Sequence, residues 1–294
     1  MRRASRLPTF INSRTGSSLM ARSWLKWVDQ PWKPVLIFGM RRYEGRRVVV
    51  TGAGSGIGQG IALRLLDEGA QLVAADIDEA GLAATAEKAG EAAERLRTVP
   101  VNIADPASVR AAIDAALEFL GGMDVLVNAA GILRPARTHE MPLDAWNQVL
   151  GVNLTGTFLM TQAALPSLLD TGHGVVVNLS STAAFSAAPY LAAYAASKGG
   201  VNAFTHAIAL EYAKQGLRAV NIVPGGIISG ITTKSILDQP AGFDPKLFSR
   251  MTGWLNGGTL GNPEDIAGVV AMVASEDGRY LTGTEIRIDG GMLM

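Results

Sequence analysis

Residues 47–58, Arg47-Val48-Val49-Val50-Thr51-Gly52-Ala53-Gly54-Ser55-Gly56-Ile57-Gly58, determine the predicted fold. The first five form a β-branched run of strand length, and an amphipathic helical pattern follows the glycines. A strand, a glycine-rich turn and a helix N-terminus in this order can hold a pyrophosphate, because backbone N–H groups can approach it and the helix dipole favours its charge. The residues expected to contact it are Gly52, Ser55, Gly56, Ile57 and Gly58.

The next strand supplies a second sign of a dinucleotide site. An apolar run over 71–75 ends in Asp76, about 20 residues past the glycines, where a carboxylate would accept hydrogen bonds from the adenosine ribose. The same carboxylate would repel a 2′-phosphate, and no Arg or Lys stands in the segment 76–79. NAD is therefore expected in preference to NADP. The alternative for Asp76 is a helix cap.

The rest of the chain alternates strand and helix patterns. Further strands are predicted over 97–101, 124–127, 174–179, 219–223 and 285–288, and helices over 79–95, from 105, and over 143–169, 190–215 and 263–275. Right-handed crossovers place such strands in one parallel sheet that helices cover on both faces. The predicted fold class is therefore α/β: a single-domain, doubly wound parallel sheet, or Rossmann fold, over residues 41–294.

Composition narrows the classes of function. With 294 residues, of which 48% are hydrophobic, the chain can bury the core of one large domain. Its 26 basic and 26 acidic residues cancel, so nothing favours nucleic acid or an anionic membrane as a partner. The chain has no cysteine and only three scattered histidines, which leaves a metal site without support. A small-molecule partner and a cytoplasmic location are expected.

Residues 1–40 differ from the rest of the chain. They carry seven arginines and lysines against the single acid Asp29. This composition fits an organellar transit peptide or a disordered basic arm. A third interpretation, which we favour, is that Met40 is the natural start, because residues 41–47 already supply a polar segment before the first strand. We therefore expect a basic N-terminal extension that is disordered or not native.

Small and polar residues follow the predicted strands. Because the carboxyl ends of parallel strands meet at one edge of the sheet, these residues should face one ligand. Asn102 would read an adenine edge, and the segment 128–131 would expose its backbone to a flat ligand, unless it is an ordinary turn. The cofactor contacts expected at this edge are Asp76, Ile77, Asn102, Ile103, Asn128, Ala129, Ala130, Gly131, Tyr194, Lys198, Pro224, Gly225, Ile227 and Ser229.

Tyr194-Ala195-Ala196-Ser197-Lys198 places a phenol and an ammonium one helical turn apart. A cation about 4 Å away would lower the pKa of a phenol by about 3 units, so such a tyrosine could exchange protons near neutral pH. The spacing alone also occurs on solvated helix faces. Ser181 follows the strand 174–179, and Asn153 with its flanking glycines costs the helix 143–169 about 2 kcal/mol, which suggests a function.

These motifs together resemble the short-chain dehydrogenase/reductase family over residues 41–294. The matching pieces are Thr51-Gly52-x-x-x-Gly56-x-Gly58, Asn128-Ala129-Ala130-Gly131, Asn153, Ser181, Tyr194-x-x-x-Lys198, Pro224-Gly225 and Asp289-Gly290-Gly291. The family commonly has aspartate at the position of Asn102, a second asparagine at Ala129 and threonine at Ser229. None of these departures touches the implied chemistry.

The resemblance implies a set of catalytic residues. Tyr194 would be the general acid/base, and Lys198 would lower its pKa and hold the nicotinamide ribose. Ser181 would hydrogen-bond the substrate oxygen. Asn153 would bind a water through which protons reach Lys198.

Residues 228–260 interrupt the alternation with apolar residues set among Gly, Pro and Ser. We expect one or two short helices that form a lid, or alternatively a hydrophobic contact between subunits. Because the segment is rich in apolar side chains and has no cluster of basic ones, an apolar or bulky substrate is expected: a hydroxysteroid, a cyclic alcohol or an acyl chain.

The resemblance implies an NAD-dependent oxidoreductase that transfers a hydride between nicotinamide and a secondary alcohol or its ketone. One alternative is a 3-oxoacyl (acyl-carrier-protein) reductase using NADPH, against which Asp76 argues. Another is a catalytically silent dinucleotide-sensing or scaffolding protein, which would usually have lost Tyr194 or Lys198. Relatives of this fold pair through the two long helices, here 143–169 and 190–215, so a homo-oligomer, a dimer or tetramer, is expected.

Overall fold

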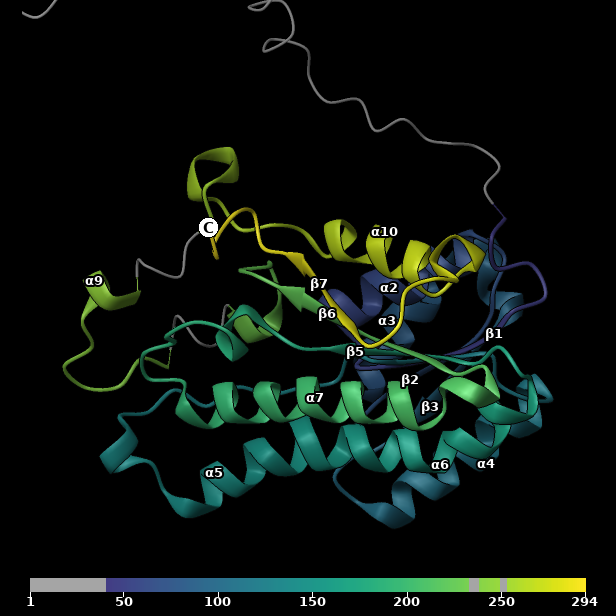
Figure 1. The fold of residues 1–294 in the computed structure, drawn as a ribbon, viewed down its shortest axis with the longest axis horizontal. Coiled ribbons are helices and arrows are strands. Elements are labelled where there is room, and N and C mark those ends of the chain that lie inside the picture. The colour runs from purple at the N-terminus through teal and green to yellow at the C-terminus, as the bar shows by residue number, and fades with distance from the viewer. Residues whose placement is uncertain (1–40, 233–237, 249–252) are drawn as a thin grey trace, which may run out of the picture. The chain divides into compact units, whose positions relative to one another are not determined.

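The computed structural model describes residues 41–232, 238–248 and 253–294 (Figure 1). The expectations for residues 1–40 and for parts of the lid lie outside the described residues. No helix in the described ranges is both long and apolar enough to cross a membrane.

One parallel sheet of seven strands, in the order β3-β2-β1-β4-β5-β6-β7, forms the centre of the fold. The strands are β1 (Arg47–Thr51), β2 (Gln71–Asp76), β3 (Leu96–Pro100), β4 (Val125–Asn128), β5 (Val175–Leu179), β6 (Arg218–Pro224) and β7 (Thr284–Ile288). The chain adds strands outward from β1 to β3 and then returns to start again at β4 on the other side of β1. This reversal creates the crevice in which doubly wound sheets bind ligands.

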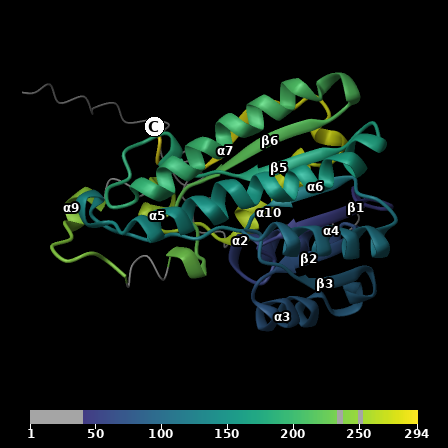
Figure 2. The ribbon, with the colours of Figure 1, turned by 90° about the horizontal axis from the view of Figure 1, so that it is seen from below.

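Helices cover both faces of the sheet, as predicted. The helices α2 (Gly56–Asp67), α3 (Glu79–Ala89) and α10 (Pro263–Val273) lie on one face, and α4 (Pro106–Leu120), α6 (Thr157–Asp170) and α7 (Ala192–Glu211) lie on the other (Figures 1 and 2). Two shorter helices, α5 (Leu143–Leu150) and α9 (Pro245–Phe248), lie near the N-terminal end of α7. The doubly wound α/β prediction is confirmed.

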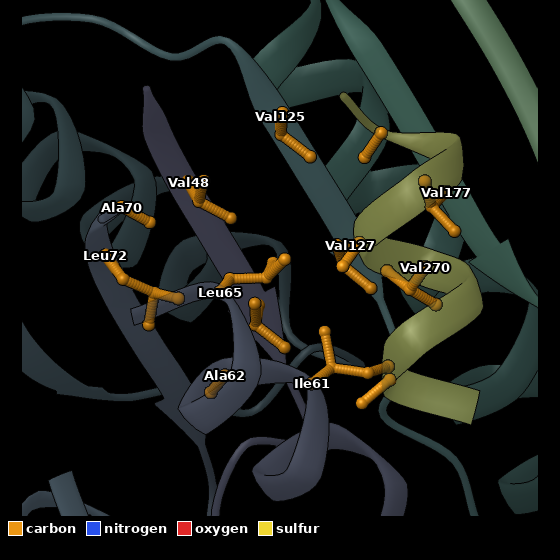
Figure 3. Packing of buried hydrophobic residues seen from close by; sticks show 14 of the residues in the cluster. Val48, Ile61, Ala62, Leu65, Ala70, Leu72, Val125, Val127, Val177 and Val270 are labelled. Carbon is orange, nitrogen blue, oxygen red and sulfur yellow. The ribbon is translucent and has the colours of Figure 1, made fainter. Parts of the chain in front are cut away.

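The central strands are buried on both faces, which is why they are runs of branched apolar residues rather than alternating ones. Val125 and Val127 of β4 face the side of α2 and α10, where Ile61 and Val270 pack (Figure 3). Leu126, between them in the sequence, faces the opposite core under α4 and α6. The strand alternation therefore supplies two separate hydrophobic cores.

A row of buried amides crosses the second of these cores. Asn128, Asn178 and Asn221 are aligned on β4, β5 and β6, and we call them the asparagine row. Asn128 Nδ2 donates to Asn178 Oδ1 at 2.8 Å and to Thr161 Oγ1 of α6 at 3.1 Å. Asn178 Nδ2 donates to Thr205 Oγ1 of α7 at 2.8 Å, and Thr205 Oγ1 donates to Asn221 Oδ1 at 2.7 Å. Each strand is thus tied sideways through side chains as well as through the backbone.

The structure alters two predicted helices. The helix predicted over 79–95 ends at Ala89, and Gly90, with φ +54°, begins a 3-10 turn that runs to Arg95. The helix predicted over 143–169 is interrupted by a π-helical segment, Gly151–Gly156, between α5 and α6. A wide turn is the physical consequence of the poor helix formers noted there, and π-bulges are frequently found at functional sites.

The lid region 228–260 contains the short helix α9 and a 3-10 turn, Leu255–Gly258, within its described parts. Its described apolar side chains at Ile228, Leu247 and Trp254 are largely exposed. Both the lid and the subunit-contact interpretations stay predictions.

Candidate active site

A cavity of about 530 Å³ opens at the carboxyl edge of the sheet, beside the point where the strand order reverses. Most of the predicted cofactor contacts line it: Gly52, Ser55, Gly56, Ile57, Gly58, Asp76, Ile77, Asn102, Ile103, Ala129, Ala130, Gly131 and Ser229. These residues come from the ends of β1 to β4 and from the segment after β6. These residues of the predicted sheet edge therefore line one cavity, which we call the cofactor cavity.

The glycine turn of the cofactor cavity has no room for a side chain at Gly52 or at Gly58. Gly52 has φ +70°, and a Cβ atom there would lie 2.7 Å from the backbone nitrogen of Ala130. A Cβ atom on Gly58 would overlap the carbonyl oxygen of Gly52. Thr51 Oγ1 accepts hydrogen bonds from the N–H groups of Ala129 and Ala130 at 3.1 and 3.2 Å, which holds the end of β4 against the turn. Bare backbone packed this closely at a helix N-terminus fits a pyrophosphate.

Asp76 lies at the end of β2 and faces this turn. Its Oδ2 atom accepts the N–H of Gly54 at 2.8 Å, and its Oδ1 atom accepts the N–H of Asp78 at 3.0 Å. Asp78, rather than Asp76, stands at the N-cap of α3. The carboxylate is therefore held at the wall of the cavity, beside the exposed Ile77, in the position suited to a ribose.

A second, smaller cavity of about 80 Å³ adjoins the first, and we call it the reaction cavity. Its lining includes Ser181, Tyr194, Lys198, Pro224, Gly225 and Ile227. Ile57, Ala129, Gly131 and Ser229 line both cavities, so a ligand in one can reach the other. The structure thus brings three of the four predicted catalytic residues together beside the predicted cofactor contacts.

Helix α7 places Tyr194 and Lys198 on its buried side. Lys198 Nζ donates to the carbonyl of Leu179 at 2.6 Å and lies 5.8 Å from the centroid of the Tyr194 ring. Burial lowers the pKa of Lys198 to about 8. Burial also raises the pKa of Tyr194, while its hydrogen bond with Ser181 acts in the opposite direction.

The expectation that Lys198 lowers the pKa of Tyr194 differs from the structure, in which burial raises that pKa and the hydrogen bond with Ser181 acts against the rise. Removal from water disfavours both the phenolate and the ammonium, and this effect is larger than that of any neighbouring charge on Tyr194. A positive charge near the phenol would act against this effect of burial.

Asn153 lies behind the reaction cavity, fully buried in the π-helical segment. Its Nδ2 atom donates to the carbonyl of Ile132 at 2.9 Å and to Ser197 Oγ at 3.0 Å, and its Oδ1 atom accepts the N–H of Ile132 at 2.8 Å. Ser197 Oγ in turn donates to the carbonyl of Tyr194 at 2.7 Å. Asn153 therefore joins the segment after β4 to the turn of α7 that carries the phenol.

One predicted cofactor contact lies elsewhere. The side chain of Asn128 points into the sheet interior, where it bonds Thr161 and Asn178, and it lines neither cavity. Side chains on a strand alternate between faces, so Asn128 shares the buried face of Leu126. Asn128 supports the sheet below the cofactor cavity instead of reaching into it.

Sequence reasoning also missed several residues of the site. Asn147, Gln148 and Val152 of α5 and the π-helical segment line the cofactor cavity, and Ile231 lines both cavities. None of them stands in a recognisable motif. Only the unfavourable helix composition around Asn153 indicated that this region had a special role.

In the described parts of the chain, no group of three or more His, Asp or Glu side chains is placed to hold a metal ion. The reaction cavity combines a phenol, a hydroxyl and an amine beside the cofactor cavity. That combination defines a class of protein, a Rossmann-fold oxidoreductase.

Comparisons with known proteins agree with this class. A family model described as enoyl-(acyl carrier protein) reductase matches residues 52–293. The chain belongs to the short-chain dehydrogenase/reductase family. It is an alcohol dehydrogenase or ketoreductase that uses a nicotinamide dinucleotide.

Three curated relatives are each 36% identical to the chain and each span 85% of it. The 2,5-dichloro-2,5-cyclohexadiene-1,4-diol dehydrogenase of Sphingobium indicum is matched over 97% of its length. The D-threitol dehydrogenase of Mycolicibacterium smegmatis is matched over 94% of its length, and the 3beta-hydroxysteroid dehydrogenase 1 of Eggerthella lenta over 95%. Identities are over the matched residues.

Among solved structures, the 3-ketoacyl-(acyl-carrier-protein) reductase from Brucella melitensis, complexed with NADH, is similar with a TM-score of 0.76 and 33% identity. The match covers 85% of this chain and 99% of that one.

Proposed function

We propose that this protein is an NAD-dependent oxidoreductase that transfers a hydride between nicotinamide and an apolar or bulky secondary alcohol or its ketone. The observation that carries the proposal is the junction of the two cavities. Ser181, Tyr194 and Lys198 line the reaction cavity, which shares five lining residues with the cofactor cavity that Asp76 lines. A substrate oxygen beside Tyr194 would therefore lie next to the end of a bound dinucleotide.

The proposed proton chemistry belongs to Tyr194. As a phenolate it accepts the proton of an alcohol during oxidation, and as a phenol it donates that proton to the carbonyl oxygen during reduction. Ser181, hydrogen-bonded to Tyr194, orients the same oxygen as charge develops on it. When bound, the nicotinamide supplies or accepts the hydride and, when oxidised, adds the positive charge that the phenolate requires.

Lys198 and Asn153 have supporting roles in this proposal. The Lys198 amine, fixed at the Leu179 carbonyl, is placed to hold a ribose hydroxyl and to exchange protons near pH 8. Asn153 holds the carbonyl and N–H of Ile132 and, through Ser197, the backbone of Tyr194. We propose that it fixes the position of the phenol and holds the water of a proton path to Lys198.

Asp76 supports NAD over NADP. Its carboxylate is fixed by the N–H groups of Gly54 and Asp78, so it cannot turn away from a 2′-phosphate without losing both bonds. The segment 76–79 offers no cation to balance that phosphate. The cofactor preference therefore follows from like-charge repulsion at the cavity wall.

An apolar or bulky substrate is supported by Ile227 and Ile231 in the lining of the reaction cavity. A cyclic diol and a hydroxysteroid are named for two of the relatives, whereas the name of a third specifies the small polar D-threitol. The second candidate is 3-oxoacyl reduction, which the similarity to the Brucella melitensis enzyme favours. The substrate panel below must therefore include all of these chemistries.

The test is Tyr194→Phe, assayed with NAD against cyclic, steroidal, acyl and polyol alcohols by absorbance of the reduced cofactor. Loss of one general acid/base should lower kcat by about 10²- to 10⁴-fold, with NAD affinity kept. Tyr280→Phe, a change at a fully exposed tyrosine, is the matched control. Unchanged turnover by Tyr194→Phe would refute the mechanism. NAD binding by the wild type without turnover of any substrate would favour the sensing or scaffolding alternative.

Further expectations complete the proposal. We propose that residues 41–294 form the catalytic domain, that residues 1–40 are a separate basic extension, and that the protein acts in the cytoplasm. Exposed apolar side chains on α6 and α7, Phe158 and Leu210, support a homo-oligomer built on these helices. Light scattering of the purified protein would test the dimer or tetramer.

A further inference from the structure

Tyr190, two residues before α7 begins, has an unusual backbone conformation. Its φ angle is +66°, and it is the one residue other than glycine with a positive φ among the residues described. A bulky side chain rarely adopts this region, and it persists there only where surrounding contacts determine it. The contacts of Tyr190 therefore indicate what the strained conformation is for.

Tyr190 contacts two segments that are distant in sequence. Its hydroxyl oxygen accepts the N–H of Asp244 at 3.0 Å, and its ring lies against that of Phe243 with centroids 5.4 Å apart. Its carbonyl accepts the N–H of Ala136 at 2.9 Å. The positive φ thus lets one residue hold the lid region through its side chain and the segment after β4 through its backbone.

Arg137 holds the same part of the lid region from the other side. Its Nε atom donates to the carbonyl of Ala241 at 3.1 Å, and its Nη2 atom donates to the carbonyl of Gly242 at 2.7 Å. The rigid fork of a guanidinium suits two adjacent carbonyls. Gly242 has φ +68°, a backbone conformation that favours glycine, and a Cβ atom there would lie 2.6 Å from Arg137 Nη2, so a larger residue would disturb this contact.

Both holding residues are attached to the reaction cavity through short stretches of chain. Tyr190 is four residues before Tyr194. Arg137 is five residues after Ile132, whose backbone Asn153 binds through two hydrogen bonds. The position of residues 241–244 is therefore set by the same two segments that carry or support the reacting groups.

We propose that Tyr190 and Arg137 form a clasp that fixes residues 241–244 beside the two segments leading to the reaction cavity, and that this clasp favours bulky cyclic alcohols over small ones. Both are positioning residues, since neither lines the reaction cavity. Only the part of the proposal that concerns substrate choice rests on the proposed alcohol oxidation. The clasp itself rests on the contacts of Tyr190 and Arg137 with residues 241–244.

The first test compares Tyr190→Phe and Arg137→Met with the wild type in steady-state kinetics. Each variant removes hydrogen bonds to the lid region, so each should raise KM for a bulky cyclic alcohol by about 3- to 10-fold. KM for 2-propanol and for NAD should change by less than about twofold, because these ligands gain nothing from the lid position. The double variant should show less than the product of the single effects, as expected for residues acting on one segment.

The second test measures hydrogen–deuterium exchange and needs no turnover. Tyr190→Phe should speed exchange in the peptide covering 241–248 and leave α7 unchanged, because it frees the N–H of Asp244. Tyr280→Phe and Arg279→Met, at exposed sites of the same residue types, should change neither exchange nor KM.

These two measurements separate the failure of the clasp from failure of the proposed function. If the wild type oxidised no alcohol but exchange still rose, the function would fail and the clasp would stand. Unchanged exchange in both variants would overturn the clasp. Faster exchange with equal KM changes for cyclic alcohols and 2-propanol would overturn its role in substrate choice.

Discussion

The cofactor cavity and the reaction cavity lie side by side, but they are built from different parts of the chain. The cofactor cavity depends on bare backbone, with Gly52 and Gly58 packed where no side chain fits. The reaction cavity depends on long side chains, of which Tyr194 and Lys198 are moved from their ordinary pKa values by burial. The first should fail when atoms are added, whereas the second should respond to protonation and to contacts made far along the chain.

The largest expected effect tests the cofactor cavity, which depends on closely packed backbone. Gly58→Ala places a methyl group on the Gly52 carbonyl, and neither backbone can turn aside, so we expect a loss of about 3 kcal/mol or more in unfolding free energy. Urea denaturation would measure it. Gly199→Ala, within α7 where an added Cβ meets nothing within 4 Å, should be neutral or stabilising. Equal stability of the two variants would show that the turn has more room than the packing indicates.

The next effect tests the reaction cavity through the pH dependence of the unfolding free energy. Lys198 titrates at about 8 in the folded protein and at 10.5 when unperturbed, so between these values the unfolded chain binds more protons and stability rises with pH. From pH 8 to 10, wild type should therefore gain about 2 to 3 kcal/mol relative to Lys198→Met. Denaturant titrations at several pH values would measure this, with Lys214→Met as an exposed control. If the difference in unfolding free energy between wild type and Lys198→Met did not change with pH, Lys198 would be better solvated than its position suggests.

A third effect tests charge within the cofactor cavity. Asp76→Ser removes the carboxylate that repels a 2′-phosphate, so the ratio of kcat/KM for NAD to that for NADP should fall by about 10- to 30-fold. Asp78→Ser is the neighbouring control, because the Asp78 side chain makes no capping hydrogen bond to α3. A wild-type preference for NADP would contradict the assignment of Asp76 at once.

The smallest effect sharpens the contrast in backbone strain. At Tyr190 the positive φ should make Tyr190→Gly more stable than Tyr190→Ala by about 1 kcal/mol, since both lose the ring and only alanine is strained. At the exposed Leu210 in α7 the order should reverse, with alanine more stable than glycine by about 1 kcal/mol. Thermal unfolding of the four variants would measure this order of stability. The same order at both positions would show that the backbone at Tyr190 is not strained.

The sequence predicts the cofactor cavity well because the residues that determine it are close together in the chain. The strand at 47–51, the glycine turn and Asp76 follow one another within one strand-helix-strand unit, and β1 begins and ends at the predicted residues. Glycine spacing reports directly on where backbone must come close. Most of the predicted cofactor contacts therefore line the cofactor cavity.

The surroundings of the reaction cavity are less predictable because they depend on contacts between residues that are far apart in the sequence. No pattern around Tyr190 announces a positive φ, since the contact that rewards it is with Asp244, 54 residues away. The raised pKa of Tyr194 arises from burial, which neighbours in space produce and spacing in sequence does not show. Asn128 is a different case, because counting alternate positions from Leu126 would have placed it on the buried face.

The asparagine row has a consequence for how the chain finds its fold. Sliding one parallel strand by a single residue would turn every side chain of that strand to the opposite face. In the native alignment Asn128 donates to Asn178 and to Thr161 of α6, and Thr205 of α7 links Asn178 to Asn221, whereas a shifted strand would lose these hydrogen bonds. Shifted registers of β4, β5 and β6 are therefore higher in energy during folding, and the three amides favour the native register of these strands.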